Sequence, residues 1–592
     1  MIATYAAVLA VCAASLALGQ AAVALCGGRR WSWLAPAVGL ALLCAVCWAT
    51  VRMPGEGVLS AVAVLALVIA SVGFLRGRVD GGGEALRIGF PVGFIALAAA
   101  SLPFIVEGHF GILGTGFNPD MSQHLLAVDR LADGAGSQLL HQGYPLGPHA
   151  IVVALNKGLG IGLVQGFGGL TVAVAVLAPL TALAAFAELS SPRRIGGALV
   201  VGLAYMVASY FAQGAFKETM QALFVLAFVL ALRESTKEVW AGQLLRLVPA
   251  ALIAVGSVYA YSFPGLIWLV GALALWLALE RSLPVRPMLL ALVVFGVLAL
   301  PELGRMIDFH SFETFDPAGP GLGNLFGQVS PFEALGIWPS GDFRLAPGDG
   351  AVPAVVYYLG AAFAALLLIH GLVWCLRRRE SAILAGLFAV AAVYALTRLA
   401  GTPYTAAKSI VVAAPIAALI ILLPLLRASD WRLIRPYREK VANSRRKSAY
   451  ASLAAACYVL AAGGCSLLAF ANAPVGPTAY TPALTELRPL IASGATLVLA
   501  SDALLDDQHG ARYIVWELRG GRVCVGSEAA AGARLPRGIR FVVTEGVPHR
   551  PPYGALRVRR VDAPYVLWER IGPLRGHSDC PLIAVRQARQ GS

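Results

Sequence analysis

The sequence predicts a polytopic α-helical membrane protein with a C-terminal soluble domain of α/β or mostly β structure. Of its 592 residues, 58% are hydrophobic and 13% are charged, so too few charges are present to cover this apolar surface in water. The hydrophobic residues also gather in runs of about 17–25, the length of a helix that crosses a bilayer. This composition excludes a cytosolic enzyme, a coiled coil and a disordered scaffold.

About fourteen apolar runs are predicted to cross the membrane within a transmembrane domain of residues 1–471. The first run has no Lys or Arg before it and is long for a signal peptide, so we expect a retained span. In chain order the runs are 2–26, 31–51, 57–75, 88–106, 165–188, 195–212, 219–232, 246–262, 264–280, 285–301, 351–376, 381–399, 407–426 and 449–471.

The distribution of Lys and Arg predicts the orientation, because these residues concentrate in short cytoplasmic loops. With residue 1 outside, the inner loops hold 23 of them and the outer loops hold 8. We therefore expect a multi-pass plasma-membrane protein with both termini outside, and we interpret the formal charge of +14 as a topology signal rather than a sign of nucleic-acid binding. Residues 144–162 then form an interfacial or re-entrant helix outside.

Three polar segments lie on the predicted outer side: the loops 107–163 and 302–350, and the tail 472–592. The first loop should hold a helix from Asp120 to Leu131, and the second, rich in Gly, Pro and Phe, should be irregular and pack over a cavity. The tail should be an extracytoplasmic domain joined by a linker, 473–477. Its β-like runs are 496–500, 512–518, 522–525, 539–544, 556–561 and 565–568.

Seven of the nine cysteines fall in apolar spans, where Cys behaves as a small hydrophobic residue. The other two, Cys524 and Cys580, stand in the tail, and we predict that they pair if the tail faces an oxidising compartment. Aromatic residues in the tail could bind an acceptor glycan, although we favour a role in the cores of its strands.

The loop that carries Asp120 holds the most informative polar residues. Asp120 and His124 are four residues apart and share a helix face, and His149 follows in the same loop. A carboxylate at the outer end of a span can deprotonate an alcohol, or bind Mg²⁺ or Ca²⁺ together with the histidine. The alternative is that Asp120 only stabilises the first turn of its helix. No zinc or P-loop signature occurs, and we predict no transition-metal site.

Two further polar sites stand at the predicted outer ends of later spans. Lys217 and Glu218 precede the seventh span, and Arg398, Tyr404 and Lys408 surround the junction of the twelfth and thirteenth. A lysine about one turn inside the membrane boundary must snorkel, pair with a carboxylate or meet an anionic ligand. Together these residues and the loop histidines predict an anion site at the membrane surface.

This arrangement of many helices, an acidic residue in the first large outer loop, outer basic residues and a soluble tail resembles the GT-C superfamily of membrane glycosyltransferases. The resemblance implies a polyprenyl-phosphate sugar donor, Asp120 as the general base, Glu218 as a second acid, and Lys408 or Arg398 as the ligand of the lipid phosphate. The chain departs from the family pattern in two ways. Three spans precede the one before the Asp120 loop, where members commonly have one, and the loop lacks paired acids.

The expected function is therefore inverting transfer of a sugar to a cell-envelope glycan or lipid acceptor at the outer face, with membrane lipids as the surroundings. Pentose transfer would be similar to that of the actinobacterial arabinofuranosyltransferases. The alternatives are a transporter or flippase of a lipid-linked or anionic solute, a lipid-linked glycan polymerase or ligase, and a non-catalytic assembly subunit. The glycosyltransferase hypothesis requires Asp120, Glu218 and Lys408 to converge on one pocket.

Overall fold

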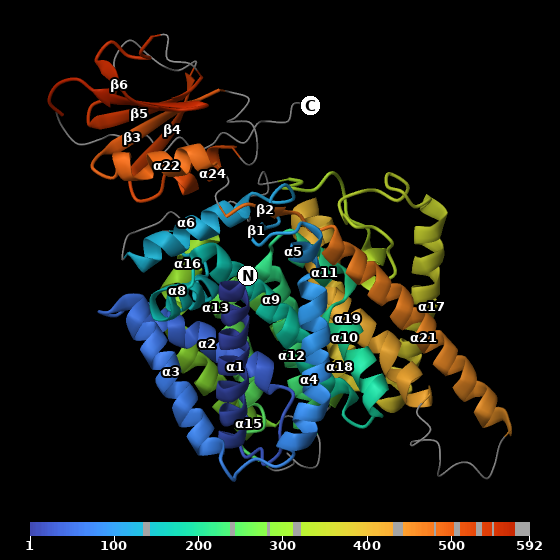
Figure 1. Ribbon diagram of the computed structural model, residues 1–592. Coiled ribbons are helices and arrows are strands. Elements are labelled where there is room, and N and C mark those ends of the chain that lie inside the picture. Colours follow the sequence, from blue (N-terminus) through green and yellow to red (C-terminus); the bar gives the residue numbers. More distant parts are fainter. Residues whose placement is uncertain are drawn as a thin grey trace.

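The computed structural model describes residues 1–133, 142–236, 243–280, 284–311, 321–429, 442–478, 481–501, 510–528, 535–546 and 550–574. They form a helical bundle and a C-terminal domain that lies over one end of it (Figure 1). The helix α6 (Asp120–Ala132) lies at the same end, which we call the α6 end (Figure 1).

Apart from two short helices at 147–159 and 303–308, the other bundle helices follow the predicted apolar runs, with ends shifted by a few residues. They are α1 (Ile2–Leu25), α2 (Ala35–Val51), α3 (Glu56–Leu75), α4 (Gly82–Ala100), α5 (Leu102–Val106), α8 (Gly147–Leu159), α9 (Leu163–Ala182), α10 (Ser191–Gly202), α11 (Tyr205–Ala212), α12 (Phe216–Ser235), α13 (Val248–Tyr261), α14 (Leu266–Glu280), α15 (Val285–Ala299), α16 (Leu303–Asp308), α17 (Ala354–Arg378), α18 (Ser381–Ala400), α19 (Pro403–Ser429) and α21 (Ala442–Ala471).

Many of these helices are long and apolar enough to cross a membrane. Within the described residues ten pass by length and composition, or eleven if α10 and α11, bent by 50° at their junction, count as one span. The chain is therefore a multi-pass membrane protein, while the count of fourteen spans stays a prediction. The helix expected within 144–162 is α8, whose 13 residues are too few to span and pack against α2 and α3.

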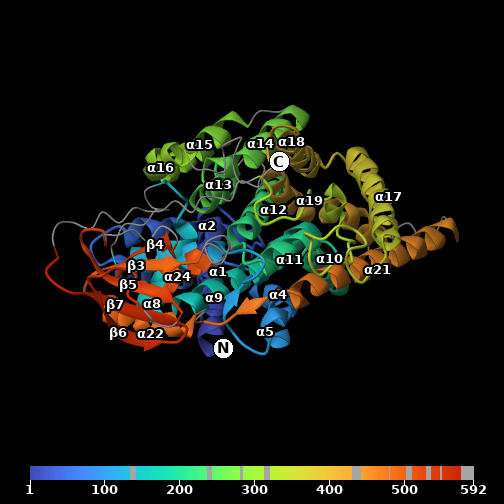
Figure 2. The ribbon, with the colours of Figure 1, turned by 90° about the horizontal axis from the view of Figure 1, so that it is seen from above.

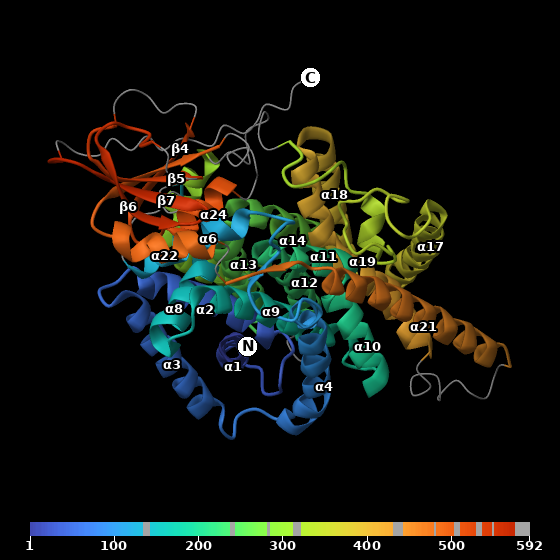
Figure 3. The same cartoon turned by 45° about the horizontal axis from the view of Figure 1, so that its top comes forward.

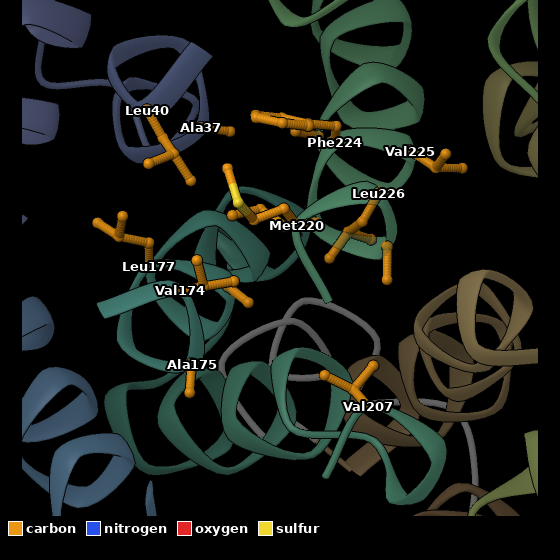
Figure 4. Packing of buried hydrophobic residues seen from close by; sticks show 14 of the residues in the cluster. Ala37, Leu40, Val174, Ala175, Leu177, Val207, Met220, Phe224, Val225 and Leu226 are labelled. Atoms are coloured by element: carbon orange, nitrogen blue, oxygen red, sulfur yellow. The ribbon is translucent and has the colours of Figure 1, made fainter. Parts of the chain in front are cut away.

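The centre of the bundle consists of α9, α12 and α19, whose apolar side chains are buried on nearly all faces. Figure 4 shows Leu40 of α2, Val174 and Leu177 of α9, and Met220 of α12 packed together. Close van der Waals packing of this kind, rather than hydrophobic transfer, holds membrane helices together. The tightly packed centre gives polar groups at the helix ends a rigid support.

The C-terminal domain is a mixed α/β domain with a five-stranded sheet in the order β4-β3-β5-β7-β6. The central strand β3 pairs in parallel with β4 and β5, and β7 pairs antiparallel with β5 and β6. The helices α22 (Pro482–Ile491) and α24 (Gly510–Glu517) accompany the sheet. The strands are β3 (Ala495–Ala500), β4 (Arg522–Ser527), β5 (Ile539–Glu545), β6 (Leu556–Asp562) and β7 (Tyr565–Arg570).

Five of the six predicted strands of the tail are confirmed, and one is wrong. Residues 512–518 form the helix α24 and its C-terminal end, and α24 packs against α6 of the bundle. The apolar residues of this run, Tyr513, Ile514, Trp516 and Leu518, are buried. Over so few residues, helical and alternating patterns cannot be distinguished by periodicity. Contact with α6 and the sheet therefore decides the structure.

The predicted linker is not a free connection. Its residues Val475–Gly476 form β2, which pairs antiparallel with β1 (Ile112–Leu113) in the Asp120 loop. Gly114 N also donates to Pro474 O at 2.8 Å. The loop 302–350 is irregular over much of its described part and contains α16 and the short turn η7 (Pro331–Leu335). The entrance to the tail thus helps to fix the segment that leads into α6.

Cys524 is buried on β4, and its predicted partner, Cys580, lies outside the described residues. The pairing of these two cysteines stays a prediction. The cysteines of the apolar spans are free thiols, in agreement with their expected role as small hydrophobic residues.

Candidate functional site

Asp120 occupies the first turn of α6, as the sequence predicts. Its backbone N–H donates to the side-chain oxygen of Asn118 at 2.9 Å, and Ser122 Oγ donates to Pro119 O at 2.7 Å. Asn118 and Pro119 thus form the turn from which the helix starts. Because the N-terminal end of a helix is electropositive, this position favours an ionised carboxylate. The Asp120 side chain is half-buried, whereas the neighbouring residues of α6 are covered.

His124 lies one turn further along α6 and points into the protein. Its Nδ1 lies 3.1 Å from Nε2 of His149 on α8, and Phe167 and Phe216 pack around the two rings. Burial and the neighbouring His124 ring lower the pKa of His149, which favours a neutral His149 ring. The buried position favours a role in packing α6 onto α8, and substrate binding by either histidine stays a prediction.

Lys217 stands in the first turn of α12. Its ammonium donates to the Tyr144 hydroxyl and lies 3.9 Å from the centre of the Tyr144 ring and 5.9 Å from that of Tyr261. It also interacts electrostatically with Asp120 and Glu218. No carboxylate of the described residues lies within 4.0 Å of the ammonium. Lys217 is therefore held by aromatic rings and a hydroxyl, which leave its charge incompletely neutralised.

Glu218 and Lys408 form a buried ion pair that joins α12 to α19. Lys408 Nζ lies 3.0 Å from Glu218 Oε1, and the two side chains are 15% and 6% exposed. Tyr404, one turn before Lys408 on α19, places its ring 4.2 Å from the ammonium. Among the three options for Lys408, the structure shows pairing with a carboxylate and not snorkelling.

Asp120, Lys217, Glu218, Tyr404 and Lys408 come together at the α6 end, and we call them the acid–lysine cluster. Tyr404 interacts electrostatically with Asp120, Glu218 and Lys408, and therefore connects the helix of the carboxylate with the ion pair. Three separate parts of the sequence contribute to this cluster: α6, the start of α12 and the start of α19.

Arg398 is outside the cluster. It is exposed in the last turn of α18, and among the described residues it makes no hydrogen bond or ion pair. The sequence placed Arg398 near Lys408 because they are only ten positions apart, but Arg398 is exposed whereas Lys408 is buried against Glu218. Its role as a phosphate ligand stays a prediction.

Tyrosines that the sequence did not single out complete the surroundings. Tyr210 of α11 and Tyr261 of α13 interact electrostatically with Glu218 and Lys408. The backbone carbonyl of Tyr144 accepts a hydrogen bond from Arg305 Nη2 at 2.5 Å, and its hydroxyl accepts one from the Lys217 ammonium. Tyr144 lies close to His149 in the sequence, which is a weak local signal, whereas nothing in the sequence links Tyr210 or Tyr261 to the site.

In the part of the chain that the structure describes, no group of three His, Cys, Asp or Glu side chains is arranged to hold a metal ion. A Mg²⁺ or Ca²⁺ ion at Asp120 therefore stays a prediction.

No protein-family model matches this chain, and no curated protein matches it by sequence. Its structure is similar to that of the arabinofuranosyltransferase AftD from Mycobacteria, with a TM-score of 0.53, 14% identity, and coverage of 82% of this chain and 40% of AftD. The chain has a GT-C-like fold. At this identity the likeness establishes the fold and not the activity, and the chain spans only 40% of the length of AftD.

Two other solved structures align with lower scores. ArnT from Cupriavidus metallidurans in the apo state gives a TM-score of 0.45 at 15% identity, covering 85% of this chain and 100% of ArnT. The archaeal oligosaccharyltransferase AglB from Archaeoglobus fulgidus gives 0.45 at 13% identity, covering 77% of this chain and 69% of AglB.

Proposed function

We propose that this chain is an integral membrane glycosyltransferase that transfers a sugar from a polyprenyl-phosphate donor to a cell-envelope glycan or lipid acceptor. The observation that carries the proposal is the acid–lysine cluster, which collects two carboxylates and two lysines at one end of a GT-C-like bundle. With the orientation predicted from Lys and Arg, the α6 end is the outer face of the plasma membrane, and the C-terminal domain is extracytoplasmic.

The lysines can stabilise the negative charge that develops in this reaction. Negative charge grows on the lipid phosphate as the glycosidic bond breaks, so a cation beside the phosphate stabilises the transition state more than the ground state. Lys217 suits this task, because no described carboxylate contacts its ammonium directly. Lys408, held by Glu218 at 3.0 Å, adds a positive charge at a fixed position near the proposed phosphate site.

Asp120 acts as the general base in this proposal. It removes the proton of the acceptor hydroxyl while the oxygen attacks the anomeric carbon on the face opposite the phosphate, and the configuration inverts. The side chain of Asp120 is half-buried, and its electrostatic interaction with Lys217 indicates that base and cation belong to one site. Glu218 serves as the partner that fixes Lys408. The positions of Asp120 and Glu218 do not identify the sugar or the acceptor, and pentose transfer is one candidate reaction.

A network of charges at the opposite end of the bundle favours chemistry at one face over passage of a solute. Arg233, at the C-terminal end of α12, donates to both oxygens of Glu380 at 2.7 and 3.0 Å. Arg427, at the C-terminal end of α19, approaches Glu380 at 3.5 Å and Glu188 at 3.1 Å. A transporter would have to break these ion pairs to open that end.

The test uses the full chain in liposomes with a panel of radiolabelled polyprenyl-phosphate pentoses and hexoses, and measures label transferred to glycan and lipid acceptors. Asp120→Asn should lower kcat by about 10²–10⁴-fold, the usual contribution of a general base. Asp133→Asn is the matched control, because Asp133 is an exposed carboxylate at the other end of α6. Full activity of Asp120→Asn would reject the mechanism, and movement of labelled lipid without transfer would favour a flippase.

A further inference from the structure

The carbonyl of Phe117, three residues before Asp120, accepts two hydrogen bonds from a distant part of the chain. Asn324 Nδ2 donates to it at 3.0 Å, and Arg344 Nη1 donates to it at 3.1 Å. Both donors belong to the segment 321–344, which lies in the irregular loop between α16 and α17. The turn that starts α6 is therefore held from outside as well as by its own hydrogen bonds.

Arg344 is fixed in one orientation by its neighbours. Its guanidinium lies 4.2 Å from the ring centre of Phe117 and 4.6 Å from that of Phe326. It donates to both oxygens of Asp342, from Nε at 2.9 and 3.2 Å and from Nη2 at 2.7 Å. A planar group held in this way between two rings and a carboxylate has a fixed orientation, and this orientation directs its Nη1 to the Phe117 carbonyl.

Asn324 links the same carbonyl to the start of α12. Its amide also donates to Gln213 Oε1 at 2.6 Å, and Gln213 ends α11 four residues before Lys217. The backbones are close here as well, since a Cβ on Gly114 would lie 2.2 Å from the Gln213 carbonyl carbon. The segment thus ties the Asp120 turn to the helix that carries Lys217 and Glu218.

The beginning of the same segment contacts α19. Tyr404 N donates to Gly321 O at 3.4 Å. Gly323 has a φ of +60°, and a Cβ at this position would lie 2.6 Å from Cδ2 of the Tyr404 ring. The segment therefore reaches Tyr404, which stands beside Lys408 in the acid–lysine cluster.

We propose that segment 321–344 sets the distance between the base and the cations, with Arg344 and Asn324 as positioning residues for Asp120. This inference rests on the proposed glycosyltransferase function. Simple packing does not account for the contacts, because a buried ion pair such as Arg344–Asp342 is costly to desolvate and an apolar pair would fill the space more cheaply. The polar groups instead hold the Asp120 turn in a defined position, and active sites require their side chains to be placed to within about 0.5 Å.

The experiment compares Arg344→Lys and Asn324→Ala with Arg560→Lys, a control on the exposed edge of β6. Lysine keeps the charge of Arg344 but loses the planar stacking and the paired donors. We expect kcat to fall by about 10–100-fold with the donor KM changed less than about threefold, because a displacement near 1 Å can cost about 10²-fold. Hydrogen–deuterium exchange of the peptide 114–124 should be faster in both variants, with the same unfolding midpoint as the control.

The exchange measurement separates this inference from the proposed function. Faster exchange with an inactive wild-type protein would reject the glycosyltransferase and retain the positioning contact. Unchanged exchange and unchanged kcat in both variants would overturn the inference, as would a rise in donor KM at constant kcat, which assigns the segment to binding. If Arg344→Lys does not fold, Asn324→Ala still decides, since it removes only the two amide hydrogen bonds.

Discussion

Removing the carboxylate of Glu218 should destabilise the bundle and leave Lys408 without its counter-ion. Both side chains are nearly covered, at 6% and 15% exposure, and their charged atoms are 3.0 Å apart. Loss of one partner from such a buried pair costs about 3–5 kcal/mol, because the remaining charge stays desolvated. The Tyr404 ring, 4.2 Å from Lys408, is in place with or without the Glu218 carboxylate and does not reduce this difference. We therefore expect Glu218→Gln to lose about 3–5 kcal/mol.

A double-variant cycle measures this interaction. Glu218→Gln, Lys408→Met and the combined variant are unfolded by SDS in mixed micelles, and their free energies of unfolding are compared. The combined variant should be more stable than the sum of the single losses predicts, with a coupling of about 2 kcal/mol or more. Additivity within about 0.5 kcal/mol would refute the reasoning, because independent sites behave in that way.

The same Glu218→Gln variant distinguishes two roles in transfer. If Glu218 only restrains Lys408, its loss increases the positive charge facing the donor phosphate, and the donor KM should fall or stay constant while kcat changes little. If Glu218 acts as a second acid in the reaction, kcat should fall at constant donor KM.

Three further outcomes are expected. Lys217→Met should raise the donor KM in transfer assays about tenfold or more. Arg398→Met alters an exposed side chain and should leave the donor KM unchanged. Equal effects of the two changes would contradict the assignment of the phosphate to Lys217. Asp129→Asn should speed hydrogen exchange in α6 and α24, because Asp129 pairs with Arg519 at 3.4 Å across this contact; unchanged exchange would argue against docking through this pair. The pKa of His149 is lowered by burial, so the folded protein favours the neutral ring. The stability that this ring contributes is present above about pH 6.5 and is lost below it, by up to about 1.4 kcal/mol per pH unit. An unfolding midpoint that stays constant from pH 7.5 to about 5.5 would exclude this effect.

The view from above in Figure 2 shows the C-terminal domain over the side of the bundle that holds α8, with α17 and α21 on the opposite side. In the tilted view of Figure 3, α6 lies between this domain and the bundle. Arg130, near the end of α6, donates to Gly521 O at 3.0 Å in the turn before β4. A helix that bears the proposed base at its first residue is thus held near its other end by the domain.

The sequence predicts the bundle well, because each span carries its own signal in about 20 consecutive apolar residues. The start of α6 is equally local, since Asn118 and Pro119 are adjacent to Asp120. The segment 321–344 has no comparable signal. Arg344 and Asn324 stand in an irregular loop without periodicity, and their partner at Phe117 is a backbone carbonyl, which any residue could supply. Contacts of this kind become visible only when the fold brings the loop to the turn.

The place of the acid–lysine cluster follows from the physics of the bundle. A charge in the middle of a buried helix such as α12 or α19 is costly, so the charged residues of these helices gather near their ends. Because α12 and α19 run in the same direction, Lys217 and Lys408 meet at the α6 end, and Arg233 and Arg427 meet at the other. The first end combines two lysines with the electropositive starts of both helices, which favours an anion. At the other end, Glu188 and Glu380 pair directly with the two arginines, whereas at the α6 end Glu218 pairs with Lys408 and the Lys217 ammonium is held by the Tyr144 hydroxyl. The difference between the ends is therefore Lys217, the lysine to which we assign the donor phosphate.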